Sequence, residues 1–388
     1  MKIAFINDMI YPFNIGGTEV KIYELAKRLA KDYGYEVHWF GVKLWKGPDT
    51  IKKGGIILHG ICRYKNLYNF GGKRTILEPL KFALKVYPEL AKHKFDLIDC
   101  SAFVYFHCFP VALAAKRKAT PLIITWNQFW GNYWYEYLGK FKGLIGKTIE
   151  KLTIHLTNNH IAISKTTKKE LISRGIKKEN VYLGYGGVDI GSINRIQRQQ
   201  KKYDLIYVGR LNHQKNVKLL IKTTAILKNQ FPEIKVCIIG NGPDRKNLEE
   251  LAVKLDLSRN IEFNGFITEK KEIYKKLKSS KIFILPSILE GLGMVVIEAH
   301  ASGIPVIVIK NKWNAAQELI ENGKNGFISE NNAEKLANLI SKILKNKKLQ
   351  EHMSNYARKS AKRFDWDKLT KDLDDYYKRI MQQNTNTK

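Results

Sequence analysis

The chain has 388 residues, of which 44% are hydrophobic, and 67 Lys and Arg against 36 Asp and Glu give a formal net charge of +31. This length and apolar content exclude general disorder and indicate two domains of fewer than about 200 residues each, while no apolar stretch reaches the roughly 18–20 residues of a membrane span. The charge favours anionic partners, but charge alone does not choose among nucleic acid, anionic lipid and phosphorylated small molecules.

The N-terminal half alternates short apolar runs with helical periodicity. The run at 2–6 is followed by turn formers, and the segment EVKIYELAKRLAKDYG then repeats its apolar residues at helical spacing as far as Gly34. Further strands are expected at residues 36–42, 56–61, 95–100 and 121–125. Apolar strands that alternate with helices are typical of a parallel sheet covered on both faces. Residues 1–190 are therefore predicted to form a Rossmann-like domain.

The alternation weakens over residues 191–204, a polar and basic stretch that we interpret as a linker, and then begins again. Strands are expected at residues 205–209, 235–240, 261–265, 281–286 and 305–310. Residues 205–365 are thus predicted to form a second Rossmann-like domain, and residues 366–383 a C-terminal helix that could cross back to the first. Ligands of doubly wound sheets lie at the carboxyl ends of the strands, so we expect the active site in a crevice between the domains.

The cysteines and the N-terminus indicate the compartment. Cys62, Cys100, Cys108 and Cys237 form no CxxC pair, and their scatter predicts neither a disulfide framework nor a zinc site. The N-terminal MKIAFIND predicts a strand and a turn rather than a signal peptide. We therefore expect a cytoplasmic protein.

Two loops after predicted strands carry candidate ligand-binding residues. Gly16 and Gly17 precede a helix that Thr18 could cap; paired glycines let a ligand approach the backbone, and a helix N-terminus favours an anion. In VGRLNHQKN, Arg210 and Lys215 lie beside a helix start and suit a diphosphate. The same residues also fit an ordinary turn and two solvated cations, and spacing alone leaves both interpretations open.

A third loop, EGLGMVVIE, holds two carboxylates eight positions apart. If a helix begins near Gly293, Glu290 lies in the loop and Glu298 lies more than one turn inside the helix, so the two contact different parts of one ligand. The free amides from Gly291 to Met294 add donors for hydroxyl or phosphate oxygens. Glu298 also interrupts an apolar run, where a solvated side chain is not expected.

These segments together resemble the retaining glycosyltransferases of family 4, whose α/β fold is GT-B, two Rossmann-like domains that face an interdomain cleft. The resemblance is carried by VGRLNHQKN, by the Gly-Pro-Asp of IGNGPD and by PSILEGLGMVVIEAHASGIPVI in the second domain. In the first domain it is carried by PFNIGGTEVKIYELAKRLA and by GGVD at 186–189. It covers essentially the whole chain, and the Glu-x7-Glu motif is its most specific part.

The resemblance implies a role for each site residue. Arg210 and Lys215 would bind the diphosphate of a nucleotide sugar, Glu290 would hold the sugar hydroxyls, and Glu298 would hydrogen-bond the ribose. The remaining donor-binding positions that it implies are Gly16, Gly17, Asn127, Gly242, Phe266, Ile267, Gly291, Leu292, Gly293 and Met294. Transfer would retain the anomeric configuration, and neither a metal nor another cofactor is implied.

One departure concerns the donor sugar. Family members often carry a histidine after the strand that ends in PLIITWN, and this chain has Asn127 there, followed by Gln128. Asparagine can hydrogen-bond a hydroxyl but cannot carry a proton. His107 could substitute, or it could be a structural histidine.

The acceptor side is predicted from residues 125–152, where aromatic residues precede Gly139 and lysines then alternate with apolar residues. Our hypothesis is that this surface meets a lipid-linked saccharide at the cytoplasmic face of an anionic membrane; a core segment and a covering loop are the equal alternative. The best donor guess is UDP-glucose, for N-glycan or surface polysaccharide assembly. A sugar-nucleotide epimerase of the same fold is one alternative. A basic nucleic-acid-binding protein is the other, and because no zinc finger, homeodomain or RNA-recognition motif is present, no nucleic acid is expected.

Overall fold

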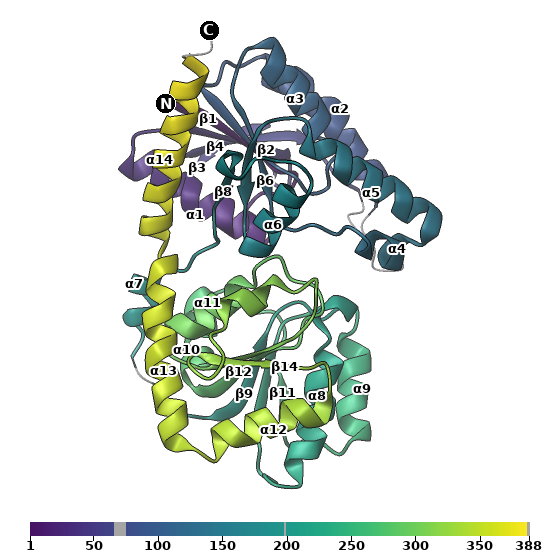
Figure 1. The fold of residues 1–388 in the computed structure, drawn as a ribbon, viewed down its shortest axis with the longest axis vertical. Helices are drawn as coiled ribbons and strands as arrows, with labels where there is room; N and C mark the ends of the chain where they lie inside the picture. The colour runs from purple at the N-terminus through teal and green to yellow at the C-terminus, as the bar shows by residue number, and fades with distance from the viewer. Residues whose placement is uncertain (66–74, 198, 386–388) are drawn as a thin grey trace. The chain divides into compact units, whose positions relative to one another are not determined.

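A computed structural model describes the chain apart from residues 66–74, 198 and 386–388. The chain divides into two compact units (Figure 1). Unit 1 comprises Met1–Gly186 together with Trp366–Lys388, and unit 2 comprises Gly187–Asp365. Each unit has a largely or wholly parallel sheet with helices packed against it, which confirms the predicted α/β class with two Rossmann-like folds.

Unit 1 is built on an eight-stranded sheet with the order β3–β4–β2–β1–β5–β6–β7–β8. Its strands are β1 (Lys2–Ile6), β2 (Glu36–Val42), β3 (Thr50–Lys53), β4 (Ile56–Cys62), β5 (Leu97–Ser101), β6 (Leu122–Trp126), β7 (Asn159–Ala162) and β8 (Val181–Leu183). All neighbouring strands pair parallel except β3 and β4, which pair antiparallel. The strand order reverses at the β1–β5 pair, so the carboxyl ends of these two strands define the place where a ligand is expected.

The helices of unit 1 are α1 (Gly17–Asp32), α2 (Leu77–Ala91), α3 (Cys108–Arg117), α4 (Tyr133–Leu138), α5 (Lys140–Ile154), α6 (Lys165–Ser173), η1 (Lys178–Asn180) and α14 (Trp366–Thr385). Helix α1 has Gly16 as its N-cap, and no side chain caps it. The prediction that Thr18 caps this helix is therefore wrong, because Thr18 already lies inside the first turn and has no helix end to close.

The C-terminal helix α14 belongs to unit 1, where it packs against α1. Tyr377 donates a hydrogen bond of 2.5 Å to the buried carboxylate of Asp99 on β5. Arg28 of α1 is paired at 2.6 Å with Asp367 at the start of α14. A helix far along the chain thus completes the cover of the first sheet.

Unit 2 has a six-stranded parallel sheet with the order β11–β10–β9–β12–β13–β14. Its strands are β9 (Tyr203–Val208), β10 (Val236–Ile239), β11 (Ile261–Phe263), β12 (Ser280–Leu285), β13 (Val306–Ile309) and β14 (Gly326–Ser329). Its helices are α7 (Ile190–Asn194), η2 (His213–Lys215), α8 (Val217–Lys228), α9 (Arg245–Lys254), α10 (Lys270–Lys278), α11 (Met294–Ala301), η3 (Ala315–Leu319), α12 (Ala333–Leu344), α13 (Lys347–Ala361) and η4 (Lys362–Phe364). Helix α7 occupies part of the stretch interpreted as a linker.

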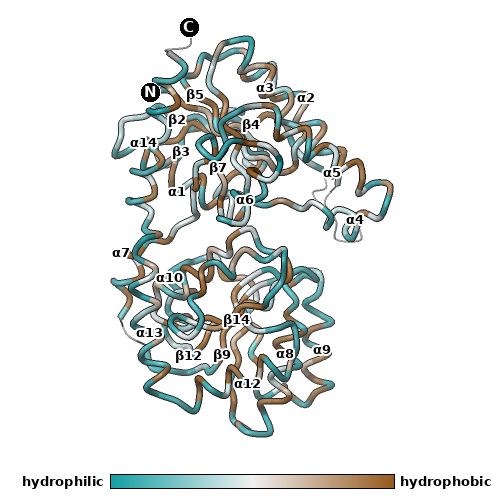
Figure 2. Tube along the Cα trace, in the orientation of Figure 1, coloured by the Kyte–Doolittle hydropathy of each residue, from teal (hydrophilic) through white to brown (hydrophobic). Residues whose placement is uncertain are grey.

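The apolar segments gather on the central strands of each unit, as the brown tube in Figure 2 shows. Trp39 and Trp126 are fully buried in unit 1, and Tyr207 and Phe283 are fully buried in unit 2. Burying one such large side chain stabilises a fold by roughly 1.5–3 kcal/mol relative to leaving it in water. Each sheet therefore has its own core, which holds the loops at its strand ends.

Two helices of unit 1 keep apolar side chains in solvent. On α2, Leu77 and Leu84 are each 80% exposed; on α5, Phe141 is 79% exposed and Leu144, Ile145 and Leu152 are also exposed. Within the described part of the chain, no helix combines the length and the apolarity that crossing a membrane requires. The apolar side chains on α2 and α5 are thus surface features of amphipathic helices.

Candidate functional site

In unit 2 the strand order reverses between β9 and β12, which pair in the middle of the sheet. The loop after β9 carries Arg210 and Lys215, and the loop after β12 carries Glu290. The backbone N–H of Ile288 donates a hydrogen bond of 2.9 Å to the carbonyl of Gln214, which ties the two loops together. The sheet therefore brings the two predicted motifs to one place.

The loop after β9 is shaped by local hydrogen bonds. The buried hydroxyl of Tyr207 donates a 2.9 Å hydrogen bond to the carbonyl of Arg210, whose side chain is exposed. The Asn212 side chain accepts one of 3.2 Å from the backbone N–H of Lys215 and thereby caps the turn η2. Asn216, with φ 50° and ψ 38°, then turns the chain into α8. The two predicted cations are thus fixed at the backbone.

The loop after β10 supports the Arg210 loop through backbone hydrogen bonds. The N–H of Leu211 donates to Asn241 O at 2.9 Å, and the N–H of Asp244 donates to Leu211 O at 3.1 Å. A Cβ atom on Gly242 would lie 2.1 Å from the Leu211 carbonyl oxygen, so only glycine fits there. Gly242 supports the Arg210 loop in this way, and its contact with a donor stays a prediction.

Glu290 and Lys215 form an ion pair, with 2.5 Å between Oε1 and Nζ. The backbone of Glu290 is held on both sides: its N–H donates to Trp313 O at 3.0 Å, and its carbonyl accepts from the N–H of Ala315 at 2.9 Å. The Glu290 side chain is only 12% exposed. Burial, with a further contribution from the Glu290 charge, raises the pKa of Tyr207 well above its usual value. The acid, the ammonium and the Arg210 loop therefore form one electrostatic group.

Helix α11 begins at Met294, with Gly293 as its N-cap at φ 79° and ψ 61°. This confirms that Glu290 lies in the loop and Glu298 inside the helix. Glu298 is 9% exposed and pairs with Lys270, the first residue of α10, at 2.6 Å between Oε1 and Nζ. Both acids of the Glu-x7-Glu motif are thus matched by a lysine from another loop.

The loop after β11 holds the two residues predicted to contact the nucleobase. Phe266 is 56% exposed and Ile267 is half-buried. Gly265, at φ 65°, accepts a hydrogen bond of 2.7 Å from the N–H of Gly240. This loop leads directly into α10, so the Lys270–Glu298 pair connects it to α11.

Unit 1 presents a second set of polar groups at the carboxyl ends of its central strands. Gly16 and Gly17 form the start of α1 after the β1 loop, and Asn127 follows β6. The Asn127 side-chain amide donates a 3.0 Å hydrogen bond to the hydroxyl of Ser101 at the end of β5. The buried Oδ1 of Asn127 and Nε2 of Gln128 have no hydrogen-bond partner within the described residues. Such buried polar atoms are rare, and a bound hydroxyl would satisfy them.

A small cavity of about 30 Å³ lies below this edge, and Lys21, Asp99 and Asn127 are among its lining residues. Lys21 donates a 2.7 Å hydrogen bond to the carbonyl of Gly184, and burial lowers the pKa of Lys21 to about 8. A cavity of this size has room for one water molecule and not for a sugar. A sugar that meets Asn127 would therefore bind outside it.

Two family models match consecutive parts of the chain. "Glycosyltransferase Family 4" matches residues 15–192, and "Glycosyl transferases group 1" matches residues 192–360. The chain belongs to the family 4 glycosyltransferases. An uncharacterized glycosyltransferase of Methanocaldococcus jannaschii is 27% identical in an alignment that is 415 residues long. The alignment covers 98% of this chain and 99% of that protein.

Solved structures of other glycosyltransferases share the fold. Sucrose-phosphate synthase from Thermosynechococcus elongatus matches with a TM-score of 0.82 at 18% identity, over 98% of this chain and 99% of that one. HepE from Anabaena, solved in complex with UDP-glucose, matches with a TM-score of 0.73 at 19% identity, over 98% of this chain and 100% of that one. These likenesses show the GT-B fold of the glycosyltransferase.

Sequence reasoning missed two residues that hold the acids of this glycosyltransferase. Lys270 pairs with Glu298, but no pattern distinguishes it in a chain that is rich in lysine. The buried amide of Asn314 donates to the carbonyls of Ser287 and Ile309, at 3.0 and 2.9 Å, and so fixes the segment that clamps the Glu290 backbone. Both interactions are recognised only in the folded structure.

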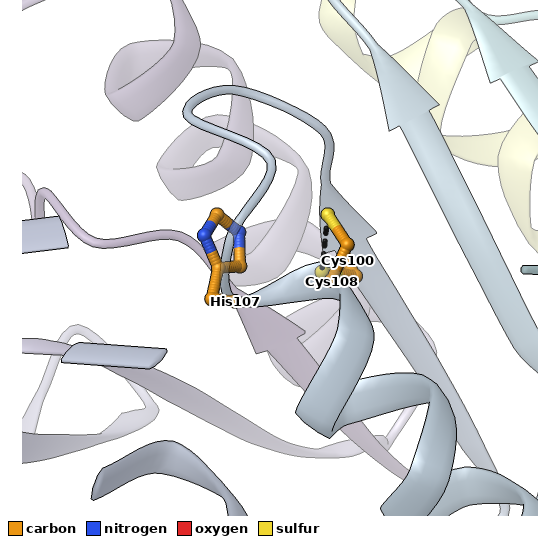
Figure 3. A group of neighbouring side chains, drawn as sticks. All are labelled: Cys100, His107 and Cys108. Carbon is orange, nitrogen blue, oxygen red and sulfur yellow. Dashed lines mark hydrogen bonds between the residues drawn. The ribbon is translucent and has the colours of Figure 1, made fainter. Parts of the chain in front are cut away.

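Sequence reasoning also missed a buried cluster in unit 1 of the glycosyltransferase. His107 is fully buried, and its Nε2 donates a hydrogen bond of 2.8 Å to the carbonyl of Ser101. Cys100 and Cys108 lie beside it, and one potential ligand atom of each of the three residues lies within 4.8 Å of the others (Figure 3). The neighbouring His107 and Cys108 could have indicated this cluster in the sequence. However, seven residues separate Cys100 from Cys108, far more than in a CxxC pair, so the spacing gave no metal-binding motif.

Proposed function

We propose that this glycosyltransferase moves a hexose from a nucleotide sugar, with UDP-glucose as the first donor to test, to a saccharide or lipid-linked glycan in N-glycan or surface polysaccharide assembly. The observation that supports this most is the Lys215–Glu290 ion pair at the carboxyl ends of β9 and β12, tied to the Arg210 loop. This pair places a cation, which suits the diphosphate, beside an acid, which suits the hydroxyls of the attached sugar.

The roles follow from charge. The diphosphate binds the guanidinium of Arg210 and the ammonium of Lys215, which it shares with Glu290. The Glu290 carboxylate accepts hydrogen bonds from the sugar hydroxyls and so places the anomeric carbon. When the bond from this carbon to the phosphate oxygen breaks, negative charge grows on the phosphate, and fixed cations stabilise that charge without reorganisation.

The stereochemistry follows from where the acceptor's proton goes. The acceptor oxygen attacks the anomeric carbon on the face that the phosphate leaves, and the departing phosphate oxygen takes the hydroxyl proton. One C–O bond forms and one breaks on the same face, which retains the configuration. Proton NMR of the first product formed tests this; an inverted anomer contradicts it.

The fixed cations also support a transfer without a metal ion. Arg210 and Lys215 supply two positive charges where other transferases place a divalent ion on the diphosphate. We expect initial rates to be unchanged when Mg²⁺ or Mn²⁺ is added to the purified enzyme. A rate that rises severalfold with either ion contradicts this part of the proposal.

The test of the whole proposal is a panel of sugar nucleotides followed by an acceptor. A donor at about 100 times its Kd stabilises the fold by about 2.7 kcal/mol, which a thermal unfolding scan detects. Nucleotide release that depends on an acceptor supports transfer. Conversion of the donor sugar without acceptor supports the epimerase alternative. The nucleic-acid-binding alternative is supported if the chain binds nucleic acid, if UDP does not displace it, and if Arg210→Ala still binds it.

We further propose that the exposed face of α5 docks on an anionic lipid surface, which places the enzyme at the cytoplasmic face of a membrane. Glu150 on the opposite side of this helix accepts hydrogen bonds from Trp130, Trp134 and Tyr105 and holds the helix to the unit. Phe141 and Ile145 then point outward, and exposed lysines flank them at Lys140, Lys142 and Lys151. An apolar stripe between cations fits an anionic bilayer interface.

This interpretation replaces part of the one made from the sequence. The aromatic residues before Gly139 were candidates for a sugar-binding or lipid-facing surface, yet Trp126, Phe129, Trp130 and Trp134 are buried. Trp130 and Trp134 pack on each other beside Glu150, with ring centroids 4.6 Å apart, and Trp126 stacks on Phe129 at 4.4 Å. The proposed membrane contact is therefore the outer face of α5 alone.

Flotation with vesicles tests the membrane contact. We expect the wild-type chain to float with vesicles that contain anionic phospholipid at low salt and not with zwitterionic vesicles, and the double variant Phe141→Ser, Ile145→Ser to lose flotation. Val253→Ser removes an exposed apolar side chain from α9 and is the matched control. Equal loss in the control, no flotation of the wild type, or a different oligomeric state of the double variant and the wild type contradicts the proposal.

A further inference from the structure

The buried cluster of Cys100, His107 and Cys108 lies where a strand, a loop and a helix meet. Cys100 is on β5, and His107 and Cys108 are at the start of α3, so the loop between them returns to the end of its own strand (Figure 3). All three side chains have no exposed surface. The chain's other cysteines, Cys62 and Cys237, are buried as well, so burial alone does not distinguish this group.

What distinguishes it is the arrangement of donor atoms. The sulfur atoms of Cys100 and Cys108 are 3.8 Å apart, and each lies 3.8 Å from the carbonyl oxygen of Ser101. The same oxygen is 2.8 Å from Nε2 of His107. Two sulfurs bound at about 2.3 Å to a tetrahedral zinc ion are themselves about 3.8 Å apart, which is the separation of Cys100 and Cys108 here.

We propose that Cys100, His107, Cys108 and the carbonyl of Ser101 form a structural zinc site inside unit 1. Thiolate and imidazole ligands select zinc over the hard cations magnesium and calcium. A closed site without an open coordination position is typical of structural rather than catalytic zinc.

The charges of the bound state balance. Each thiol loses its proton to solvent, and the imidazole keeps one proton on Nδ1 while Nε2 binds the metal. Two thiolates then neutralise one Zn²⁺, and the imidazole and carbonyl are uncharged, so the whole site carries no net charge. A neutral site is compatible with complete burial, whereas an isolated ion is not.

The site would tie together two parts of unit 1 that meet at Ser101. Its carbonyl would bind the metal, and its hydroxyl accepts the hydrogen bond from the Asn127 amide at 3.0 Å. Zinc at this position would therefore hold the end of β5, and with it the orientation of Asn127. Because the thiols are buried, the ion would enter while the loop folds rather than through the finished structure.

The experiment measures metal in the full chain, produced without a histidine tag in medium with zinc and dialysed against a weak chelator. We expect elemental analysis by inductively coupled plasma mass spectrometry to find about one zinc per chain. Cobalt added in place of zinc should give thiolate-to-cobalt charge-transfer absorption and the visible bands of a tetrahedral ion. Cys108→Ser and His107→Gln should lose both signals, while Cys237→Ser, a buried free cysteine of unit 2, should keep them.

Three results overturn the proposal: a wild-type chain without zinc, zinc that Cys108→Ser retains in full, or a thiol count that shows a Cys100–Cys108 disulfide. If a ligand variant fails to fold, the cobalt spectrum of the wild type still decides, because a site without thiolates lacks the charge-transfer band. Two protons released per zinc bound when the metal-free chain is refolded with the ion support the balance above, and none released contradicts it.

Discussion

The two units prepare for a ligand in different ways. In unit 2 the acids of the candidate site already have counterions, because Glu290 pairs with Lys215 and Glu298 with Lys270. In unit 1 the buried Oδ1 of Asn127 and Nε2 of Gln128 have no hydrogen-bond partner among the residues described. A ligand of unit 2 exchanges ion pairs that are already formed, whereas a ligand of unit 1 supplies hydrogen bonds that the fold lacks. We therefore expect unit 2 to bind the charged part of a ligand and unit 1 to bind neutral hydroxyls.

The largest expected effect is that of Glu290→Ala. Loss of the carboxylate removes the group that places the sugar, so we expect kcat/KM to fall by about 10²–10³-fold, the cost of removing one preorganised group from a reacting centre. The affinity for UDP stays similar because Arg210 and Lys215 remain. Initial rates and calorimetric titration of UDP measure the two quantities.

Glu334→Ala, which removes an exposed acid of α12, is the matched control for Glu290→Ala. Normal transfer by the Glu290 variant would contradict the role given to unit 2, because Glu290 would then only hold Lys215 in place.

A smaller effect is expected for Asn127→Ala. One hydrogen bond to a sugar hydroxyl contributes about 1.4 kcal/mol at most in typical cases, so we expect kcat/KM to fall by about tenfold. Stability in urea should change little, since the lost bond to Ser101 is offset by removal of an unsatisfied buried oxygen. Asn229→Ala on the surface of unit 2 is the control. A variant with full activity would show that Asn127 only packs against Ser101.

The effect of Lys270→Ala should be smaller still. The lysine is 42% exposed, and such partly exposed pairs contribute 1 kcal/mol or less, so we expect KM for the nucleotide sugar to rise by up to about fivefold with kcat unchanged. Lys271→Ala, the exposed neighbour, controls for loss of charge. A fall in kcat instead would place Lys270 at the reacting centre and extend the charged group of unit 2.

The last effect concerns stability at acid pH rather than catalysis, and it belongs to unit 1. Burial, followed by the neighbouring His38, lowers the pKa of His59 to about 3, from 6.5. His38 Nδ1 lies 2.7 Å from His59 Nε2, and the pKa of His38 is lowered by burial. Glu36, His93, Thr50 and the charge of Lys2 also surround this pair. The unfolded chain takes up a proton below about pH 6.5 that the folded chain refuses until about pH 3, so stability is complete above this window and falls as the pH drops through it.

His59→Gln should flatten this acid loss in urea unfolding followed from about pH 7 down to about pH 4, which covers most of the range between the two pKa values. His155→Gln removes an exposed histidine and should leave the profile unchanged. Identical profiles for wild type and His59→Gln would show that this histidine pair does not limit the stability of unit 1.

Much of the fold could be predicted because its signals are local. Apolar runs such as that at 121–125 are found as strands, here Leu122–Trp126, since a strand buried on both faces is largely apolar. The prediction left out β3, β7, β8 and β14. These strands have only three or four residues, and β7 contains the polar Asn159 and His160. The position of Glu290 before a helix that begins at Met294 was also predictable, because Gly293 marks the start of that helix.

The amino-acid sequence by itself determined the alternation of strands and helices, the loops that carry Arg210, Lys215 and Glu290, and the family to which the chain belongs. Only the tertiary structure decided that Lys215 meets Glu290, that Lys270 meets Glu298, and that α14 completes unit 1. The reason is physical: backbone periodicity and turn chemistry act between neighbours in the chain, whereas ion pairs and buried clusters form between residues that only the packing of the sheet brings together.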